Sequence, residues 1–493
     1  MRKYLGAMKR KLLIALAIIL VILTLVGVYV WYGNPSERPI EATMGLDPVL
    51  AEPEARSIPS VSLAETVGWK DGEKPSATGP LRVNRFADGL NHPRTILTLP
   101  NGDVLVTETN SPPRNLNGFA AFVAEKLLDK VGAADPSANT IVLLRDEDAD
   151  GKAEARFTLR SEGLASPSGM AFGNGKLYIA NHDAVLAFPF EPGATKLEGK
   201  PEKLMDLPPA GHHWMRNLLL SPDGKELYVA VGSASNIGEN GMEAEKGRAA
   251  IWEIDLEGGS PRQFANGMRN PNGMAWNPST GEMWATVQER DMLGPDLVPD
   301  YLTNVPVGVQ YGWPWVYWKE IFDERVDHPM PIYMLEYTRK PEYALGAHVG
   351  ALGMIFSTGG NLMGDGFANG AFVARHGSWN RKPLSGYDVI FVPYDERGNP
   401  LDEHKVVLSG FLGDDGAKGR PTWLEWDKTG ALLVSDDTAG IIWRVAAPGA
   451  KPSLAPKAIV EAGMPPLREL DATIDRKFKA TIEDDYILDP ARQ

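Results

Sequence analysis

Cysteine is absent from all 493 residues of this chain. Its absence excludes disulfide bonds, thiolate metal sites and cysteine nucleophiles, and it excludes covalently attached c-type haem, which needs a Cys-x-x-Cys-His stretch. Histidine is scarce as well, with 8 residues. Because a chain without cysteine gives no redox evidence for its compartment, the compartment has to be predicted from targeting signals.

A basic surplus is also lacking, since 64 acidic residues face 50 basic ones and the net charge is −14. Phosphate binding needs a basic face, so this balance argues against a nucleic-acid partner. With 43% hydrophobic and 23% charged residues, the composition is that of a globular protein. The length allows one large domain or several small ones.

A long apolar run lies near the start of the chain. It extends from Leu12 to Tyr32, interrupted by Thr24 and Gly27, and basic residues precede it. A helix over this run is ~30 Å long, which matches a bilayer core. A cleaved signal peptide has a shorter apolar region, so the run predicts one uncleaved transmembrane anchor, with a cleaved leader as the alternative. The positive-inside rule then predicts an inner-membrane anchor with the remaining chain in the periplasm.

Composition divides the remaining chain. We predict a membrane anchor over 1–33, a linker over 34–80 that is rich in Pro, Glu, Ala and Ser, a main folded domain over 81–447, and a C-terminal tail over 448–493.

A β-hairpin pattern recurs through residues 81–447. Its clearest copy is His212 to Gly232, in which a polar cluster opens a short apolar strand, a Pro-Asp-Gly turn follows, and a second strand alternates apolar and small residues. Five further copies open near Asn91, Ser166, Arg269, His348 and Gly419. Recurrence at intervals of tens of residues is typical of propellers, because each unit has an apolar face that only a neighbour covers.

Six copies predict an all-β fold, a six-bladed β-propeller preceded by a single N-terminal transmembrane helix. The intervals exceed the ~40–45 residues of a compact blade, so we expect inserted loops, above all between the fourth and fifth copies. The strand-like segments 81–87 and 441–445 are expected to pair in one blade, which removes exposed edges.

The polar clusters that open the copies recur in phase, so we expect His213, Arg269, His348 and Arg420 to converge on the propeller axis. A neutral imidazole has the proton affinity of a base near neutral pH, which makes His213 a candidate base. A lone histidine is nevertheless more often a surface residue or a satisfied core residue.

Several arginines could bind an anionic group. Arg269 and Asn270 offer donors suited to a developing oxyanion or a quinone oxygen, although the sequence after Asn270 is equally typical of a turn. Arg381 and Arg420 are further cations in the last two blades. They would suit a ligand with more than one carboxylate, but an arginine in an acidic protein is usually a salt-bridge partner.

Two other stretches leave their roles open. Glu289-Arg290-Asp291 lies where a strand of the fourth copy runs into a long loop, and acidic and carbonyl oxygens are what Ca²⁺ prefers. The spacing is not that of an EF-hand, and a solvated acidic loop explains it equally well. The aromatic stretch Tyr311-Gly312-Trp313-Pro314-Trp315 is either a core plug or a wall for a flat ligand.

Five motifs follow one another along the repeat region: His213-Trp214-x-Arg216-Asn217-Leu218; Gly267-Met268-Arg269-Asn270-Pro271; Glu289-Arg290-Asp291 followed by Tyr311-Gly312-Trp313-Pro314; His376-Gly377-Ser378-Trp379-Asn380-Arg381; and Gly419-Arg420-Pro421 followed by Ser435-Asp436-Asp437. In this order they resemble the quinoprotein sugar dehydrogenases that use pyrroloquinoline quinone (PQQ), in particular the branch of sorbosone dehydrogenases and soluble aldose sugar dehydrogenases. The resemblance runs from about Leu81 to Val445.

The resemblance implies a quinone lying across the top of the axial tunnel. It implies that His213 takes the proton from a sugar hydroxyl while hydride passes to the quinone, and that Arg269 and Asn270 polarise the quinone oxygens. It also implies Ca²⁺, bound through the loop of Glu289, Arg290 and Asp291. The implied cofactor-binding residues are Arg420, Arg381, His348 and His376.

The chain also departs from the glucose-oxidising members of this family. They hold a cofactor carboxylate with a lysine where this chain has the region from His376 to Arg381, which leaves Arg381 as the replacement cation. They use a pair of arginines in the last blade, where this chain has Arg420 and Thr422.

The predicted function is therefore oxidation of an aldose or a sugar aldehyde such as sorbosone, with a separate acceptor, a quinone or a cytochrome, because haem is excluded. One alternative is a Ca²⁺-dependent propeller hydrolase of the lactonase type, which would line the axis with carboxylates and asparagines. Another is a non-catalytic carbohydrate-binding propeller, for which His213→Ala would leave function intact.

Overall fold

The computed structural model describes residues 2–32, 35–55, 61–113, 126, 130–132 and 135–459. The chain divides into two units, Met1–Pro456 and Lys457–Gln493, and every element below lies in the first. Most of the predicted tail, from residue 460 onward, lies outside the described residues.

Helix α1 (Arg2–Tyr32) contains the predicted apolar run. Its segment Lys9–Val28 is long and apolar enough to cross a membrane by length and composition, and its mean hydropathy is 2.9. A signal sequence at the N-terminus would have the same properties, so the helix is compatible with either the predicted anchor or the cleaved leader.

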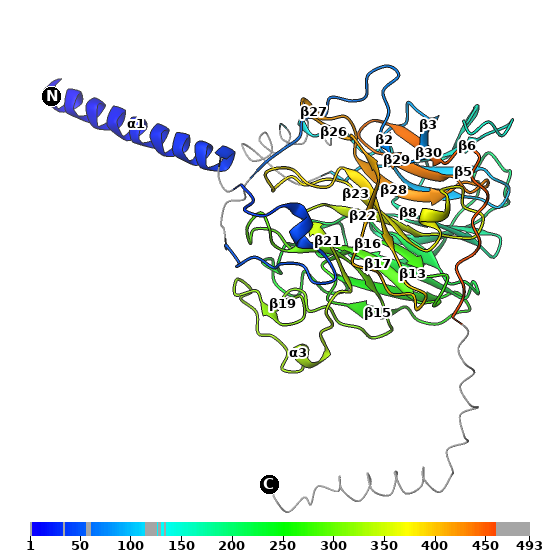
Figure 1. The fold of residues 1–493 in the computed structure, drawn as a ribbon. Helices are drawn as coiled ribbons and strands as arrows, with labels where there is room; N and C mark the ends of the chain where they lie inside the picture. Colours follow the sequence, from blue (N-terminus) through cyan, green and yellow to red (C-terminus); the bar gives the residue numbers. More distant parts are fainter. Residues whose placement is uncertain are drawn as a thin grey trace, which may run out of the picture. The chain divides into compact units, whose positions relative to one another are not determined.

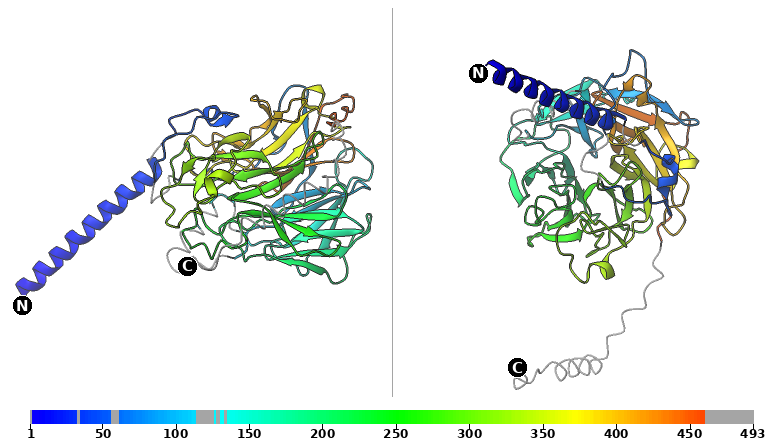
Figure 2. Two further views of the ribbon diagram at one scale, coloured as in Figure 1. Left: turned by 90° about the horizontal axis from the view of Figure 1, so that it is seen from below. Right: turned by 90° about the vertical axis from the view of Figure 1, so that its left-hand side faces the viewer.

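Six antiparallel sheets form the blades of a propeller (Figures 1 and 2). In order of blades and from the inner strand outward, the strands are β4 (Pro93–Thr98), β5 (Val104–Glu108), β6 (Thr140–Arg145), β7 (Ala155–Arg160); β8 (Gly169–Gly173), β9 (Lys176–Ala180), β10 (Ala184–Pro189), β11 (Glu202–Asp206); β12 (Leu218–Leu220), β13 (Glu226–Val231), β14 (Ala250–Asp255), β15 (Arg262–Asn266); β16 (Asn270–Trp276), β17 (Met283–Gln288), β18 (Pro299–Asn304), β21 (Tyr343–Ala347); β22 (Ala351–Phe356), β23 (Gly370–Arg375), β24 (Asp388–Pro393), β25 (Lys405–Ser409); and β28 (Pro421–Trp426), β29 (Leu432–Asp436), β30 (Ile441–Ala446), β3 (Arg82–Ala87).

Smaller elements complete the described part of the chain. They are β1 (Met44–Gly45), β2 (Ser76–Ala77), β19 (Val316–Tyr317), β20 (Ile321–Phe322), β26 (Leu412–Gly413), β27 (Gly416–Ala417), the 3-10 helices η1 (Ile40–Thr43) and η2 (Asp365–Phe367), and the short helix α3 (Met334–Tyr337).

The inner strands form a closed ring. Each of β4, β8, β12, β16, β22 and β28 contacts the next, and β28 contacts β4; Figure 1 labels β16, β22 and β28 close together. Every predicted polar cluster lies just before or at the start of one of these strands. The predicted closing pair is confirmed, because β3 lies against β30 with Val83 opposite Val445. The six-bladed propeller predicted from the repeats is therefore confirmed.

Neighbouring inner strands meet backbone to backbone near the axis. A Cβ on Gly273 would lie 2.6 Å from the carbonyl oxygen of Leu352, and one on Gly353 would lie 2.7 Å from the Cα of Trp423. The hydroxyl of Thr286 joins two blades, because it accepts the N–H of Gly273 at 3.0 Å and donates to the Leu352 carbonyl at 2.5 Å. Glycine is needed at these positions because the backbones of neighbouring inner strands approach closely. This close packing lets the inner strands surround one centre.

Apolar faces of adjacent blades cover one another, as the repeat pattern requires. Between the fourth and fifth blades the buried Trp284 packs edge to face on Tyr394 and Phe356, with ring centroids 5.2 and 6.3 Å apart. Such aromatic contacts contribute more than their buried area alone.

Part of the predicted linker is built into the propeller. β1 pairs with β21 and adds a fifth strand to the fourth blade, and β2 pairs with β25 in the same way on the fifth blade. These two short strands cover outer edges that would otherwise expose unpaired backbone groups. The predicted linker over 34–80 therefore contributes strands to two blades as well as connecting α1 to the propeller. The domain boundaries stay a prediction.

The longest insertion lies where it was expected, between the fourth and fifth hairpin copies. Residues 305–342 between β18 and β21 carry β19, β20 and α3. The aromatic stretch in this insertion acts as a core plug, because Tyr311 and Trp313 are buried and Trp313 Nε1 donates to the Asn236 carbonyl at 3.0 Å.

Candidate functional site

A cavity of about 210 Å³ lies among the residues that open the inner strands. It is lined by His212, His213, Arg269, Gln288, Glu289, Asp291, Asp300, His348, Gly350, His376, Gly377, Trp379 and Asn380. Six predicted site residues are among them: His213, Arg269, His348, His376, Glu289 and Asp291. The other four, Asn270, Arg290, Arg381 and Arg420, are not among the lining residues. The repeat phase thus brings distant side chains to one cavity.

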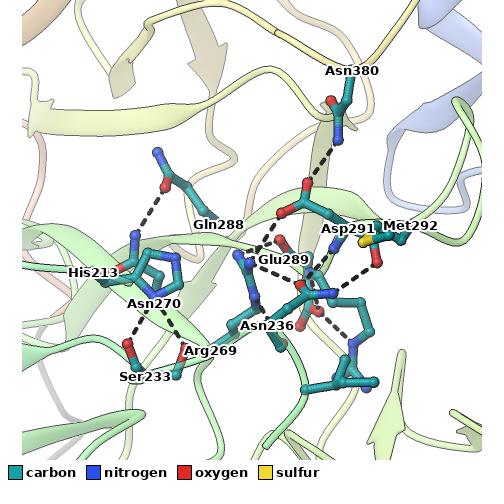
Figure 3. A network of polar contacts seen from close by, with 12 residues as sticks. His213, Ser233, Asn236, Arg269, Asn270, Gln288, Glu289, Asp291, Met292 and Asn380 are labelled. Carbon is teal, nitrogen blue, oxygen red and sulfur yellow. Dashed lines mark hydrogen bonds and ion pairs between the residues drawn. The ribbon is translucent and has the colours of Figure 1, made fainter. Parts of the chain in front are cut away.

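His213 is held by its Nδ1 atom, which lies 3.0 Å from the Ser233 hydroxyl and 3.1 Å from the Ser233 carbonyl (Figure 3). That hydroxyl donates its only proton to the Ser235 carbonyl at 2.6 Å, so it can only accept from the imidazole. Nδ1 therefore carries the proton and Nε2 keeps its lone pair. Burial lowers the pKa of His213 well below its ordinary value, and Arg269 and His212 lower it further.

Arg269 directly precedes β16, and most of its N–H groups donate hydrogen bonds to other residues of the protein (Figure 3). Its Nη1 donates to the Glu289 carbonyl at 2.6 Å, its Nη2 to the Asn236 side chain at 2.9 Å and to Asp291 at 3.0 Å, and its Nε to the Asn236 carbonyl at 3.1 Å. The guanidinium is nearly fully buried. It is thus a fixed positive charge beside the cavity.

Asn270 lies one layer behind the cavity wall. Its Nδ2 donates to Gln288 Oε1 at 2.8 Å. A Cβ on Gly232 would lie 2.2 Å from Asn270 Oδ1 and 2.7 Å from the Cβ of His213, so both side chains press on this glycine. Asn270 therefore does not line the cavity itself. It holds the lining residue Gln288 and packs beside His213.

Asp291 ties together three lining residues. Its Oδ1 accepts from Asn380 Nδ2 at 2.7 Å and lies 3.4 Å from His348 Nδ1, and its Oδ2 pairs with Arg269. Burial alone would raise the pKa of Asp291, but Arg269 and His348 hold it well below its ordinary range. Burial opposes protonation of His348, yet the contact with Asp291 raises the pKa of this histidine. Each group thus shifts the pKa of the other toward its charged form.

His376 has a carboxylate partner of its own. Its Nε2 lies 3.0 and 3.1 Å from the two oxygens of Asp437, which also binds Arg94 at 3.0 Å. Burial lowers the pKa of His376; Asp437 opposes this, while the guanidiniums of Arg420 and Arg94 add to it. Arg420 lies behind the lining, over the ring of Tyr387 at 4.8 Å.

Asp300 is a lining carboxylate that sequence reasoning missed. Its oxygens accept the backbone N–H groups of Glu289, Gly350 and Ala351 at 2.8 to 3.0 Å. Burial raises the pKa of Asp300 to about 6 despite these hydrogen bonds. It joins the fourth blade to the fifth at the cavity.

Two of the predicted residues serve the structure around the cavity. Arg381 pairs with Asp296 at 3.1 Å and donates to Ser36 at 2.7 Å, so it holds the segment before η1 against the propeller. Arg290 is fully buried and pairs with Glu289 at 3.0 Å and with Asp323 at 3.4 Å. Their charges are compensated inside the protein.

The loop of Glu289, Arg290 and Asp291 does not fit the implied Ca²⁺. The Glu289 carbonyl accepts from Arg269, and the Asp291 carbonyl accepts from Arg325 at 2.9 Å and from Asn236 at 3.0 Å. The Asp291 carboxylate is bound by Arg269, Asn380 and His348. Ca²⁺ needs several free oxygens at ~2.3–2.6 Å, and these oxygens already face cations or amide donors.

An acidic cluster elsewhere was also missed. Asp146, Asp148, Asp150 and Glu154 place ligand atoms within 4.8 Å of one another in the turn after β6. The Asp-x-Asp-x-Asp-Gly order from Asp146 to Gly151 was a signal that could have identified it. Exposed acidic clusters are common without a bound ion.

Comparison with known proteins identifies relatives of the chain. A family profile described as TrAA12-like matches residues 137–299 and 335–448. The chain is 34% identical over 134 residues to a pyrroloquinoline quinone-dependent pyranose dehydrogenase of Coprinopsis cinerea, a match that covers 23% of this chain and 18% of that protein.

Two solved structures share the fold. The holo form of the PQQ domain of pyranose dehydrogenase from C. cinerea aligns with a TM-score of 0.60 at 19% identity, over 78% of this chain and 100% of that chain. A calcium structure of a Trichoderma reesei protein of Carbohydrate-Active Enzymes Family AA12 aligns with a TM-score of 0.61 at 19% identity, over 76% of this chain and 97% of that chain. At these identities the likeness shows the fold alone.

The family profile covers more than half of the chain, on both sides of the insertion in the fourth blade. The resemblance predicted from the five motifs is thereby confirmed at the level of the family. The chain belongs to the TrAA12-like family.

Proposed function

We propose that this protein is a PQQ-dependent oxidoreductase that oxidises an aldose or a sugar aldehyde of the sorbosone kind. The observation that carries the proposal is the state of His213 in the cavity: a neutral imidazole with Nδ1 protonated and bound to Ser233, and with Nε2 free to accept a proton. Family membership and a relative named as a pyrroloquinoline quinone-dependent pyranose dehydrogenase support the same chemistry.

The cavity suits a polar ligand that carries both hydrogen-bond donors and acceptors. Two buried polar atoms have no hydrogen-bond partner among the described residues: the acceptor Asn380 Oδ1, on a lining residue, and the donor Arg420 Nε, behind the lining. Arg420 and Arg94 are cations on the His376 side, where carboxylates of a cofactor would bind. We assign His348, His376 and Asn380 to cofactor contact, with Arg420 behind them. Arg381 is compensated by Asp296 and receives no such role in the proposal.

When bound, pyrroloquinoline quinone would supply a two-electron acceptor for the hydride that leaves the sugar carbon. The residues of the chain prepare the sugar for this transfer. Nε2 of His213 takes the proton of the reacting hydroxyl, and the Ser233 carbonyl stays bound to Nδ1–H while the ring becomes charged. Burial and, after it, Arg269 lower the pKa of His213 and favour the neutral resting ring, and Asn270 positions the wall through Gln288.

The hydrolase alternative loses support from the cavity itself. Three carboxylates do line the cavity, which the sequence led us to expect only for a lactonase-type enzyme. Asp300 accepts three backbone N–H groups, and Asp291 is bound by Arg269 and Asn380. Glu289 accepts from the buried Arg290. A metal-dependent hydrolase needs carboxylates that are free to coordinate an ion.

The N-terminal helix completes the proposal. A span over Lys9–Val28 would anchor the enzyme in the inner membrane with the propeller in the periplasm. Because the chain has no cysteine for a covalently attached haem, electrons from the reduced cofactor would pass to a separate acceptor, a quinone or a cytochrome.

Reconstitution tests this function. The purified full chain is loaded with PQQ, with and without Ca²⁺, and dye reduction is followed over a panel of aldoses and sugar aldehydes. We expect turnover with at least one sugar and a cofactor-dependent rise in melting temperature. His213→Asn is the matched variant, which should bind cofactor and lose turnover. Absence of both turnover and the thermal shift would reject the proposal.

A further inference from the structure

The loop after β17 turns two consecutive carbonyl groups toward one cationic atom. Nη1 of Arg325 donates to the Asp291 carbonyl at 2.9 Å and to the Met292 carbonyl at 3.1 Å. In an extended chain successive carbonyls point to opposite sides. Here Met292 has φ of 70°, a left-handed conformation that is uncommon outside glycine, and it brings both oxygens to the same side.

Arg325 is held rigidly in this position. Its Nε and Nη2 donate to the two oxygens of Asp323 at 2.8 and 2.7 Å, a bidentate pair. The Asp323 side chain is fully buried and also lies 3.4 Å from Arg290. The guanidinium is thus fixed on one edge by a carboxylate and presents Nη1 to the loop.

The charges around the loop are balanced without a metal. Arg269, Arg290 and Arg325 pair with Asp291, Glu289 and Asp323, three cations with three anions. A divalent cation would have to compete with Arg325 for the same carbonyl oxygens, and it would add charge to a part-buried network that is already neutral. Uncompensated charge in such surroundings is costly.

The segment that supplies Arg325 belongs to the insertion in the fourth blade. Arg325 and Asp323 follow β20 directly, and they lie between the two stretches that match the TrAA12-like profile, 137–299 and 335–448. The family match therefore does not extend to Arg325, and the contacts of this residue in the present chain indicate its role.

We propose that the guanidinium of Arg325 takes the place of a divalent cation at the loop from Glu289 to Met292, so that this loop keeps its conformation without Ca²⁺. Arg325 is a positioning residue, because it holds the loop from which Asp291 reaches Arg269, His348 and Asn380 in the cavity. The inference deepens the proposed function, and it rests on that function only for the statement that cofactor binding needs no Ca²⁺ at this loop.

Thermal unfolding of the full chain in detergent tests the proposal. The background carries Asp148→Asn and Asp150→Asn, which removes the exposed acidic cluster as a second place for the ion. In this background we expect the same melting temperature in EGTA and in millimolar Ca²⁺, because Arg325 already fills the position. We expect Arg325→Gln to lower the melting temperature in EGTA and Ca²⁺ to restore part of it, since the two carbonyls lose their donor Arg325, while Asp323 loses its bidentate partner and keeps its contact with Arg290.

Two matched variants sharpen the result. Arg325→Lys keeps a positive charge and should stay insensitive to Ca²⁺. If the Gln variant does not fold, the comparison of EGTA with Ca²⁺ in the protein with intact Arg325 remains the test. Arg262→Gln, an exposed arginine paired with Glu253, should be insensitive as well. A loss of melting temperature on chelation while Arg325 is intact would overturn the proposal, and so would a folded Arg325→Gln protein that Ca²⁺ fails to stabilise.

A final arm separates this inference from the proposed function. We expect PQQ to raise the melting temperature of the background protein equally in EGTA and in Ca²⁺. If PQQ produces no shift in either solution, the proposed function fails while the Ca²⁺ comparison still decides the role of Arg325. A PQQ shift that requires Ca²⁺ in this background would overturn the role of Arg325 alone.

Discussion

Four histidines line the cavity, and three of them, His213, His348 and His376, differ in what lies behind each ring. Behind His213 are a carbonyl and a hydroxyl of Ser233, which accept a proton from Nδ1 but carry no charge. Behind His348 and His376 are the carboxylates of Asp291 and Asp437. A neutral acceptor fixes the tautomer and favours the imidazolium only weakly, so burial and Arg269 outweigh it at His213, whereas a carboxylate favours the imidazolium more strongly. The neutral side of the cavity is therefore that of His213, and the charged side is that of Asp291 and His348, whose pKa Asp291 raises; burial keeps the pKa of His376 lowered despite Asp437.

The largest effect is expected when the proposed base, His213, is removed. His213→Asn keeps a polar side chain but has no nitrogen lone pair for the substrate proton, so we expect turnover to fall by ~10²–10⁴-fold, the usual contribution of a general base. Steady-state kinetics with dye reduction measure it. Melting temperature and cofactor affinity should stay close to those of the wild type. His404→Asn, directly before β25, is the control that should retain activity, and wild-type turnover in His213→Asn would contradict the assignment.

The second test acts on the charged side of the cavity. Asp291→Asn leaves the buried Arg269 and the neighbouring His348 without their counter-charge. Removing one partner of a buried pair costs about 3–5 kcal/mol, so we expect unfolding by urea at a clearly lower midpoint. Asp206→Asn breaks the exposed pair with Lys203 and should change stability by no more than about 0.5 kcal/mol. Equal effects of the two variants would show that Asp291 does not organise the cavity.

The sequence predicted the fold because its signals are local. Period-two strands and the turns between them define each hairpin, and the repeated opening cluster sets the phase in which His213, Arg269 and His348 reach one cavity. The same phase did not bring Arg420 to the lining, because its guanidinium turns to the ring of Tyr387. Phase predicts where a backbone position lies, while the direction of a long side chain depends on its neighbours.

The remaining site residues depend on contacts between distant segments. Arg381 is satisfied by Ser36, which is 345 positions away in the sequence, so no pattern near Arg381 could identify its partner. The partner of the Asp291 carbonyl, Arg325, comes from an inserted segment with no repeat counterpart. Ser233 lies two residues after the second strand of its hairpin, and a polar residue at that point is a local signal that could have been used.

The pH dependence of turnover tests whether the pKa of His213 is lowered, as the comparison of the histidines requires. Burial and Arg269 lower the pKa of His213, so the base stays neutral at pH values where an ordinary histidine, with a value of 6.5, is protonated. We expect kcat/KM to remain level through this value and to fall only at lower pH, about tenfold per unit. An acidic limb at or above 6.5 would contradict the lowered value. The free energy of unfolding should also decrease as pH falls, because the unfolded chain binds the proton of this histidine more readily than the folded protein does.

The smallest expected effect comes from the hydroxyl behind His213. Ser233→Ala removes Oγ but leaves the Ser233 carbonyl 3.1 Å from Nδ1, so the proton stays on Nδ1 and Nε2 remains available. Loss of one hydrogen bond is worth about 0.5–1.5 kcal/mol, so we expect turnover to fall by ~2–10-fold. Ser221→Ala, in the turn of the same hairpin, removes a hydroxyl that binds Asp223 and should affect stability alone. If Ser233→Ala instead abolished turnover, the hydroxyl and not the carbonyl would set the tautomer, and the neutral side of the cavity would depend on a single side chain.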